Sequence, residues 1–101
     1  MQIINLPSGC GNELKLSGEV DFHRSPRLRA ALRVKLRERN PLLVLDCTEL
    51  EYIDSCGMAA LLEYVRGARE FGGRLAVKGL NPSLRSIFEL VHLDQHLLLL
   101  S

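Results

Sequence analysis

The sequence has no tryptophan, and aromatic residues make up only 5% of it. No apolar run approaches the roughly 20 residues that a membrane-spanning helix needs. The first residues, MQIINLPSG, lack the basic start and the long apolar stretch of a secretion signal. No nucleic-acid-binding motif accompanies the few aromatic residues. We therefore expect a cytoplasmic protein with no membrane span and no nucleic acid partner.

Cysteine and metal-binding patterns are also scarce. The three cysteines, Cys10, Cys47 and Cys56, cannot all pair within one chain, and none are spaced as C-x-x-C. Reduced thiols in a cytosolic protein fit this pattern best. His92 and His96 are four residues apart, but no third ligand stands near them, so ordinary surface histidines are expected. The sequence predicts no metal and no cofactor.

What the chain does have is the composition of a globular protein. Its 101 residues are 47% hydrophobic and 25% charged, which predicts one domain over residues 1–101.

The charges are unevenly distributed along the chain. Seven of the 13 basic residues lie between Arg24 and Arg39, together with one acid, whereas residues 40–65 contain five acids and no base. A basic face and an acidic face are expected. Arginines at positions 29, 33 and 37 share one helical face, which indicates either a solvated surface or contact with an acidic partner or anionic lipid headgroups.

Apolar periodicity predicts strands alternating with helices. Two short strands, Gln2–Leu6 and Glu13–Gly18, flank the turn PSGCGN and should form an antiparallel hairpin. Three helical stripes follow, listed by their apolar positions: 28, 31, 32, 36; 58, 61, 62, 65, 68; and 84, 87, 88, 91. Strands are expected at residues 42–45, 74–78 and 97–100. The order β-β-α-β-α-β-α-β implies an α/β fold with a mixed, mostly parallel sheet and helices packed on it.

Local signals give more detail on element ends. Leu42–Leu45 is a continuous apolar run, which is typical of a strand covered on both faces, and Asp46–Tyr52 is predicted to be a polar connection. Ser25, followed by Pro26, is predicted to cap the first helix. Ser55 is predicted to cap the second helix, which Gly72-Gly73 should end. Asn81-Pro82 repeats the same start signal for the third helix.

Three segments together carry a family resemblance. They are Gly18-Glu19-Val20-Asp21, then LVLDCTELEYIDSCGMAALL, then GGRLAVKGLNPSLRSIFELVHLD. In this order and spacing, from about Leu14 to Leu97, the chain resembles STAS domains, specifically the stand-alone anti-sigma factor antagonists of bacteria. The resemblance implies a STAS-like fold. It also implies a non-enzymatic protein that binds a cytoplasmic anti-sigma factor, often a serine-protein kinase, and so regulates sigma-factor-dependent transcription.

The resemblance also implies where the partner binds. In the family, phosphate usually enters a Ser or Thr just before the glycine of D-S-[ST]-G, and a serine phosphatase is then a further partner. Here that position is Cys56, which ordinary serine kinases do not phosphorylate, so Ser55 becomes the phosphorylation candidate. The partner-binding residues implied by the family are Asp21, Asp54, Ser55, Cys56, Gly57 and Met58.

The residues themselves leave alternatives open. Ser55 is either a helix cap or a phosphoacceptor, and these roles compete for one oxygen. Cys56 either fills space or is a redox-sensitive thiol at a helix start. Asp21 and Asp54 either stabilise loops or contact the partner, and a side chain at position 57 would block docking.

Two other functions compete with the antagonist. Some single-domain STAS proteins bind the ATPase of an ABC-type lipid transport complex without phosphorylation, and the arginine stripe and Cys56 suit that role. An enzyme using Cys56 as nucleophile is least favoured, because the three histidines lie far from it in sequence.

Overall fold

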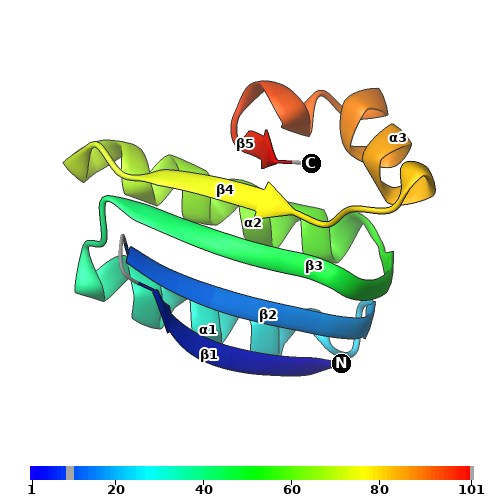
Figure 1. Cartoon of the computed structure of the whole chain (residues 1–101), viewed down its shortest axis with the longest axis horizontal. Helices are drawn as coiled ribbons and strands as arrows, with labels where there is room; N and C mark the ends of the chain where they lie inside the picture. Colours follow the sequence, from blue (N-terminus) through cyan, green and yellow to red (C-terminus); the bar gives the residue numbers. More distant parts are fainter. Residues whose placement is uncertain (9–10, 101) are drawn as a thin grey trace.

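The computed structural model describes the backbone of residues 1–8 and 11–100, and the side chains of residues 1–4, 13–93 and 95–100. Its five strands form one sheet in the order β1-β2-β3-β4-β5 (Figure 1). The strands are β1 (Gln2–Ser8), β2 (Gly11–Val20), β3 (Leu42–Ile53), β4 (Arg74–Lys78) and β5 (Leu98–Leu100). Only β1 and β2 pair antiparallel, and the other neighbours are parallel. The predicted α/β order and mostly parallel sheet are confirmed.

The first hairpin is longer than predicted. Most of the segment PSGCGN is strand, since Pro7 pairs with Asn12 and Ser8 with Gly11. Gly9 and Cys10 lie outside the described residues, so the prediction of a reduced Cys10 stays a prediction. Further along, the pairing of β2 with β3 shifts register at Gly18, whose φ of +81° a side chain would strain.

Strand β3 corrects two predictions. It continues through the segment 46–52 that was expected to be a polar connection, and it ends at Ile53. It is also buried on one face rather than two, since Leu43, Leu45 and Cys47 are buried while the residues between them are partly exposed. The charged residues of 46–52 point to the open face or to solvent, so a long half-buried strand accommodates them.

Helices α1 (Ser25–Glu38) and α2 (Ser55–Ala68) pack against each other and lie behind the sheet in Figure 1. The core lies between them and the sheet, and Leu16, Leu28, Leu45, Leu61 and Val77 are among its fully buried side chains. Past α2 a short 3-10 helix, η1 (Arg69–Phe71), ends at Gly72, whose φ is +72°. The predicted stop at the glycine pair is therefore confirmed.

Helix α3 (Pro82–Leu90) begins as predicted, because the Asn81 side chain accepts a hydrogen bond from the Leu84 N–H at 2.8 Å. A second 3-10 helix, η2 (Leu93–Gln95), leads into β5.

The cap that the sequence predicts for α1 is wrong. Arg24 holds the cap position without a side-chain bond, and Ser25 is already the first helical residue. In the part of the chain described here, no helix is long and apolar enough to cross a bilayer.

The open face of the sheet carries paired charges rather than an acidic patch. Lys15, Asp46 and Lys78 stand side by side on β2, β3 and β4. Lys15 forms an ion pair with Glu49 at 3.4 Å, and Lys78 forms one with Glu13 at 3.3 Å. On the helical face Arg29 pairs with Glu63. The predicted separation into one basic and one acidic face is thus blurred, because several acids of residues 40–65 lie beside basic partners.

Candidate partner-binding site

Helix α2 begins where β2 and β3 end, and one carboxylate organises that junction. Oδ1 of Asp54 accepts hydrogen bonds from the backbone N–H groups of Cys56, at 2.9 Å, and Gly57, at 3.1 Å. The Asp54 N–H donates to the carbonyl of Val20 at 3.0 Å, which ties the helix start to the end of β2. Asp54 is therefore the N-cap.

The cap predicted at Ser55 is one residue too late. Ser55 is the first residue of α2, its side chain is exposed, and none of its hydrogen bonds to the described residues involves the hydroxyl. The expected competition between cap and phosphoacceptor is thereby removed, because the Asp54 carboxylate takes the capping role. The Ser55 oxygen is available to solvent at the positive end of the helix dipole.

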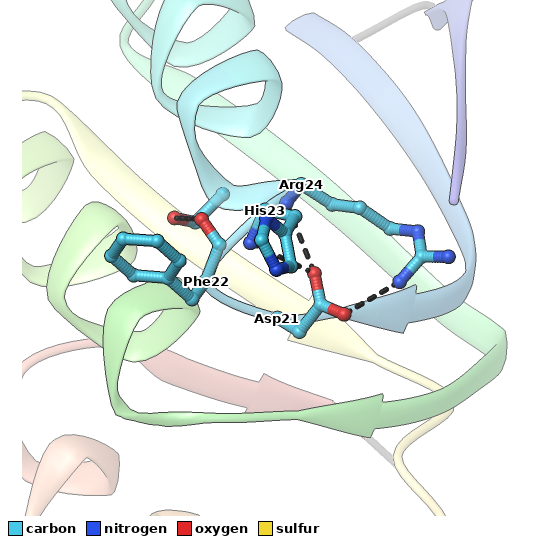
Figure 2. A network of polar contacts seen from close by, with 5 residues as sticks. Asp21, Phe22, His23 and Arg24 are labelled. Carbon is cyan, nitrogen blue, oxygen red and sulfur yellow. Dashed lines mark hydrogen bonds and ion pairs between the residues drawn. The ribbon is translucent and has the colours of Figure 1, made fainter.

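Asp21 organises the neighbouring loop between β2 and α1 (Figure 2). Its Oδ1 accepts from the backbone N–H groups of His23 and Arg24, at 3.1 and 3.0 Å, and its Oδ2 accepts from the Arg24 guanidinium at 2.6 Å. Desolvation raises the pKa of Asp21, but the Arg24 and His23 backbone bonds and their charges outweigh it, so the pKa lies below its usual value. The loop-stabilising role is present, and partner contact by Asp21 stays a prediction.

That loop presents an aromatic residue that sequence reasoning missed. The side chain of Phe22 is 69% exposed and meets the His23 ring edge-on, with the ring centroids 5.4 Å apart. Figure 2 shows Phe22 projecting from the loop away from the Asp21 carboxylate. The one available signal was an apolar residue between charged neighbours, outside any apolar stripe. An exposed aromatic ring held by a fixed loop suits an interface.

Two hollows flank the first turn of α2, and Ser55 and Ala59 line both. One, of about 470 Å³, lies toward α1 and includes Phe22, His23 and Cys56. The other, of about 240 Å³, lies toward η2 and is mostly apolar, with Met58 and Leu62 on the α2 side; Val91, Leu93 and His96 complete it. We call this combined surface the α2 ridge: residues Phe22, His23, Ser55, Cys56, Met58, Ala59 and Leu62.

The ridge contains three of the six predicted site residues, namely Ser55, Cys56 and Met58. Gly57 is buried, and a Cβ built on it would lie 2.6 Å from Cγ1 of Ile53 and 2.8 Å from Cγ1 of Val20. A side chain there would therefore disturb the packing of α2 on the sheet, and its effect on docking stays a prediction. Met58 and Cys56 are partly exposed at the surface.

The described cysteines are both free. Cys47 is buried, and burial followed by the nearby Asp46 charge raises the pKa of its thiol to about 12, which makes it a poor nucleophile. Cys56 and His23 line the same hollow, an arrangement that their separation in sequence did not predict. No hydrogen bond joins the two among the described residues, and no group of potential metal ligands occurs there.

A family model described as "Mlab, STAS domain" matches residues 8–101 of the chain. The chain belongs to the STAS domain family. The anti-sigma-B factor antagonist of Listeria monocytogenes is 28% identical to this STAS domain over 82 residues, which is 81% of this chain and 72% of the relative.

Solved structures agree with the fold. An anti-sigma factor antagonist from Mycobacterium paratuberculosis superposes with a TM-score of 0.87 at 23% identity, over 97% of this chain and 83% of the other. The Bacillus cell fate determinant SpoIIAA, in its phosphorylated form, superposes at 0.76 and 19% identity, over 99% and 92% of the two chains. The predicted STAS-like fold is confirmed.

Proposed function

We propose that this protein is an anti-sigma factor antagonist. It binds an anti-sigma factor in the cytoplasm through the α2 ridge and so frees a sigma factor for transcription. Relatives that carry this name support the proposal. The observation that carries it is the exposed, Asp54-capped start of α2, with a hollow on either side and Phe22 projecting beside it.

The ridge has the features of a binding surface rather than of a catalytic centre. Its hollows are open and partly apolar, and the exposed Phe22 ring lines one of them. Catalysis by Cys56 would need a positioned base, and the His23 ring lacks a hydrogen bond to it in the described part of the chain. This arrangement supports a binding role for the ridge.

Ser55 is the proposed phosphorylation switch, with the anti-sigma factor as a serine-protein kinase and a serine phosphatase reversing its action. The hydroxyl is exposed and not used as a cap, which supports this role. A phosphate would add about two negative charges beside the Asp54 carboxylate, in the centre of the ridge. Repulsion and desolvation of that charge would weaken partner binding.

The first test is affinity capture of the tagged protein from its native cells, with mass spectrometry of its partners and of the 54–66 peptide. The proposal predicts recovery of a kinase-like anti-sigma factor, and phosphate on Ser55 in part of the population. The Ser55→Asp variant should lose at least about tenfold in affinity. Ser83→Asp is the matched control, because Ser83 is an exposed serine in the first turn of α3.

The acceptor is tested separately. Ser55→Ala should abolish phosphate incorporation, whereas persistent labelling would point to another residue. Cys56→Ser restores the family's usual acceptor, and it should gain phosphorylation by the same kinase. If Ser55→Ala keeps its phosphate label and Cys56→Ser gains none, while the wild type still binds its partner, the phosphorylation switch is overturned. The antagonist role itself would not be contradicted.

A second candidate is a STAS subunit that binds the ATPase of an ABC-type lipid transport complex without phosphorylation. The observation that favours it is Cys56 at the usual acceptor position. Arg33 and Arg37 are also exposed on α1, whereas Arg29 is engaged by Glu63. Capture of transporter ATPase subunits, with the 54–66 peptide unmodified, would favour this function over the antagonist.

A further inference from the structure

A separate cleft lies at the edge of the sheet where β4 and β5 begin. Its volume is about 310 Å³, and it is bounded by the last turn of α2, the start of β4 and the segment that enters β5. Two arginines and a histidine line it (Arg69, Arg74 and His96), together with an apolar wall that includes Val65, Leu75 and Leu97. No carboxylate belongs to this lining among the described side chains.

The contact between Arg69 and His96 fixes the donors in the cleft. Nη2 of Arg69 lies 2.9 Å from Nδ1 of His96. A guanidinium only donates hydrogen bonds, so Nδ1 must be the acceptor and the neutral ring carries its proton on Nε2. The imidazole therefore offers an N–H donor of its own, and its orientation is held by Arg69.

Arg74 adds a third donor group from another element. Its backbone N–H donates to the carbonyl of Pro41 at 3.0 Å, which fixes the first residue of β4. Its side chain is exposed and forms no ion pair with any described residue. Arg69, Arg74 and His96 thus bring three donor groups from different elements to one cleft, which Val65, Leu75 and Leu97 also line.

We propose that this cleft binds a small phosphate monoester that carries an apolar group. A phosphate has three terminal oxygens for the three donor groups, and arginine is suited to paired hydrogen bonds with phosphate. The apolar part of the ligand would cover the Val65, Leu75 and Leu97 wall. The cleft shares only His96 with the hollows of the α2 ridge. The proposed ligand site therefore does not rest on the proposed antagonist function.

Titration of the isotope-labelled protein with phenyl phosphate, followed by amide NMR shifts, tests this site. We expect saturable shifts at residues 69, 74 and 95–98, and an affinity at least about fivefold tighter than for inorganic phosphate, because only the ester reaches the apolar wall. Arg69→Gln and Arg74→Gln should each weaken binding by at least about fivefold. The matched control is Arg85→Gln, which removes a partly exposed arginine paired with Glu89 on α3.

Three results of the titration would contradict the proposed ligand site. Shifts that do not saturate, or that persist unchanged in the Arg69→Gln and Arg74→Gln variants, would mean unspecific attraction to a basic protein. Equal affinity for phenyl phosphate and inorganic phosphate would remove the apolar part of the site. Unchanged amide signals elsewhere in the spectrum verify that each variant is folded.

Discussion

At the scale of single residues, Asp54 matters most, because its carboxylate takes two backbone donors at the start of α2. Asp54→Ala should lower the free energy of unfolding by about 1 kcal/mol, the usual cost of removing an N-cap. Asp54→Asn should keep most of that stability, because an amide oxygen still accepts both bonds. Urea unfolding curves of the two variants check this, and equal losses in both would show that charge, rather than capping, is what the residue contributes.

Replacing Gly57 by alanine should lower the stability of the protein, whereas the same replacement inside a helix usually raises it. Alanine in place of glycine inside a helix normally stabilises it by up to about 1 kcal/mol. At position 57, however, the added Cβ meets Ile53 and Val20 well inside contact distance, so Gly57→Ala should destabilise by about 1–3 kcal/mol.

The matched control for Gly57 is Gly67, also in α2, where the atoms nearest to an added Cβ are the two terminal methyl carbons of Leu36, at 3.1 Å. Gly67→Ala should be nearly neutral or stabilising in the same thermal unfolding assay. A more stable Gly57→Ala protein would mean that α2 can move off the sheet at its start without loss.

The sequence predicted the junction residues but not their exact duties. Asp54 and Ser55 are both good capping residues, and which one caps depends on a one-residue difference in where the helix begins. That difference is decided by the Asp54 N–H bond to Val20, a contact across 34 positions of sequence that no local pattern contains. The exposed position of Phe22, and the hollow that His23 and Cys56 both line, depend in the same way on how β2 and β3 end side by side.

At the scale of elements, α1 and α2 meet around a buried tyrosine. Tyr64 is 1% exposed, and its hydroxyl has no hydrogen-bond partner among the described residues. Burial, and then the Glu38 charge, raise the pKa of Tyr64 to about 12. Tyr64→Phe removes the unpaired hydroxyl and keeps the ring, so stability should rise by up to about 1 kcal/mol.

Chemical unfolding of Tyr64→Phe measures this directly. Tyr52→Phe is the control, since Tyr52 is 48% exposed on β3 and its hydroxyl reaches solvent, so no change is expected there. A loss of more than about 1 kcal/mol in Tyr64→Phe would show that the hydroxyl is bonded in solution.

The sequence predicted which segments are helices or strands better than it predicted which face of the sheet is buried. The helices at residues 25–38 and 82–90 begin and end near their apolar stripes and proline signals. Strand β3 was predicted too short and too buried, because LLVL reads as continuously apolar. Its open face becomes visible only when the register places Asp46 between Lys15 and Lys78, which is a property of three strands together.

At the scale of the whole molecule, two carboxylates make stability depend on acid pH. Desolvation raises the pKa of Asp46, but hydrogen bonds from Thr48 and the charges of Lys78 and Lys15 lower it by more than that. The folded-state pKa values of both Asp46 and Asp21 therefore lie below the ordinary value near 3.8. Such groups stabilise the fold above their unfolded pKa, and that contribution is lost as pH falls through the folded pKa.

The melting temperature should therefore fall as pH drops below about 4. Asp46→Asn keeps the oxygen that accepts from Thr48 but cannot titrate, so its melting temperature should fall less steeply in that range. Thermal melts between neutral pH and about pH 3 test this. Parallel acid limbs for the wild type and Asp46→Asn would show that other carboxylates carry the dependence.

The central claim is that the α2 ridge binds an anti-sigma factor, and hydrogen exchange of the complex with the captured partner tests it most directly. The account predicts slower amide exchange at residues 21–24 and 55–62 in the complex, and loss of that protection in the Ser55→Asp variant. Protection at the open face of the sheet, around Lys15, Asp46 and Lys78, with the ridge exchanging as in the free protein, would contradict it.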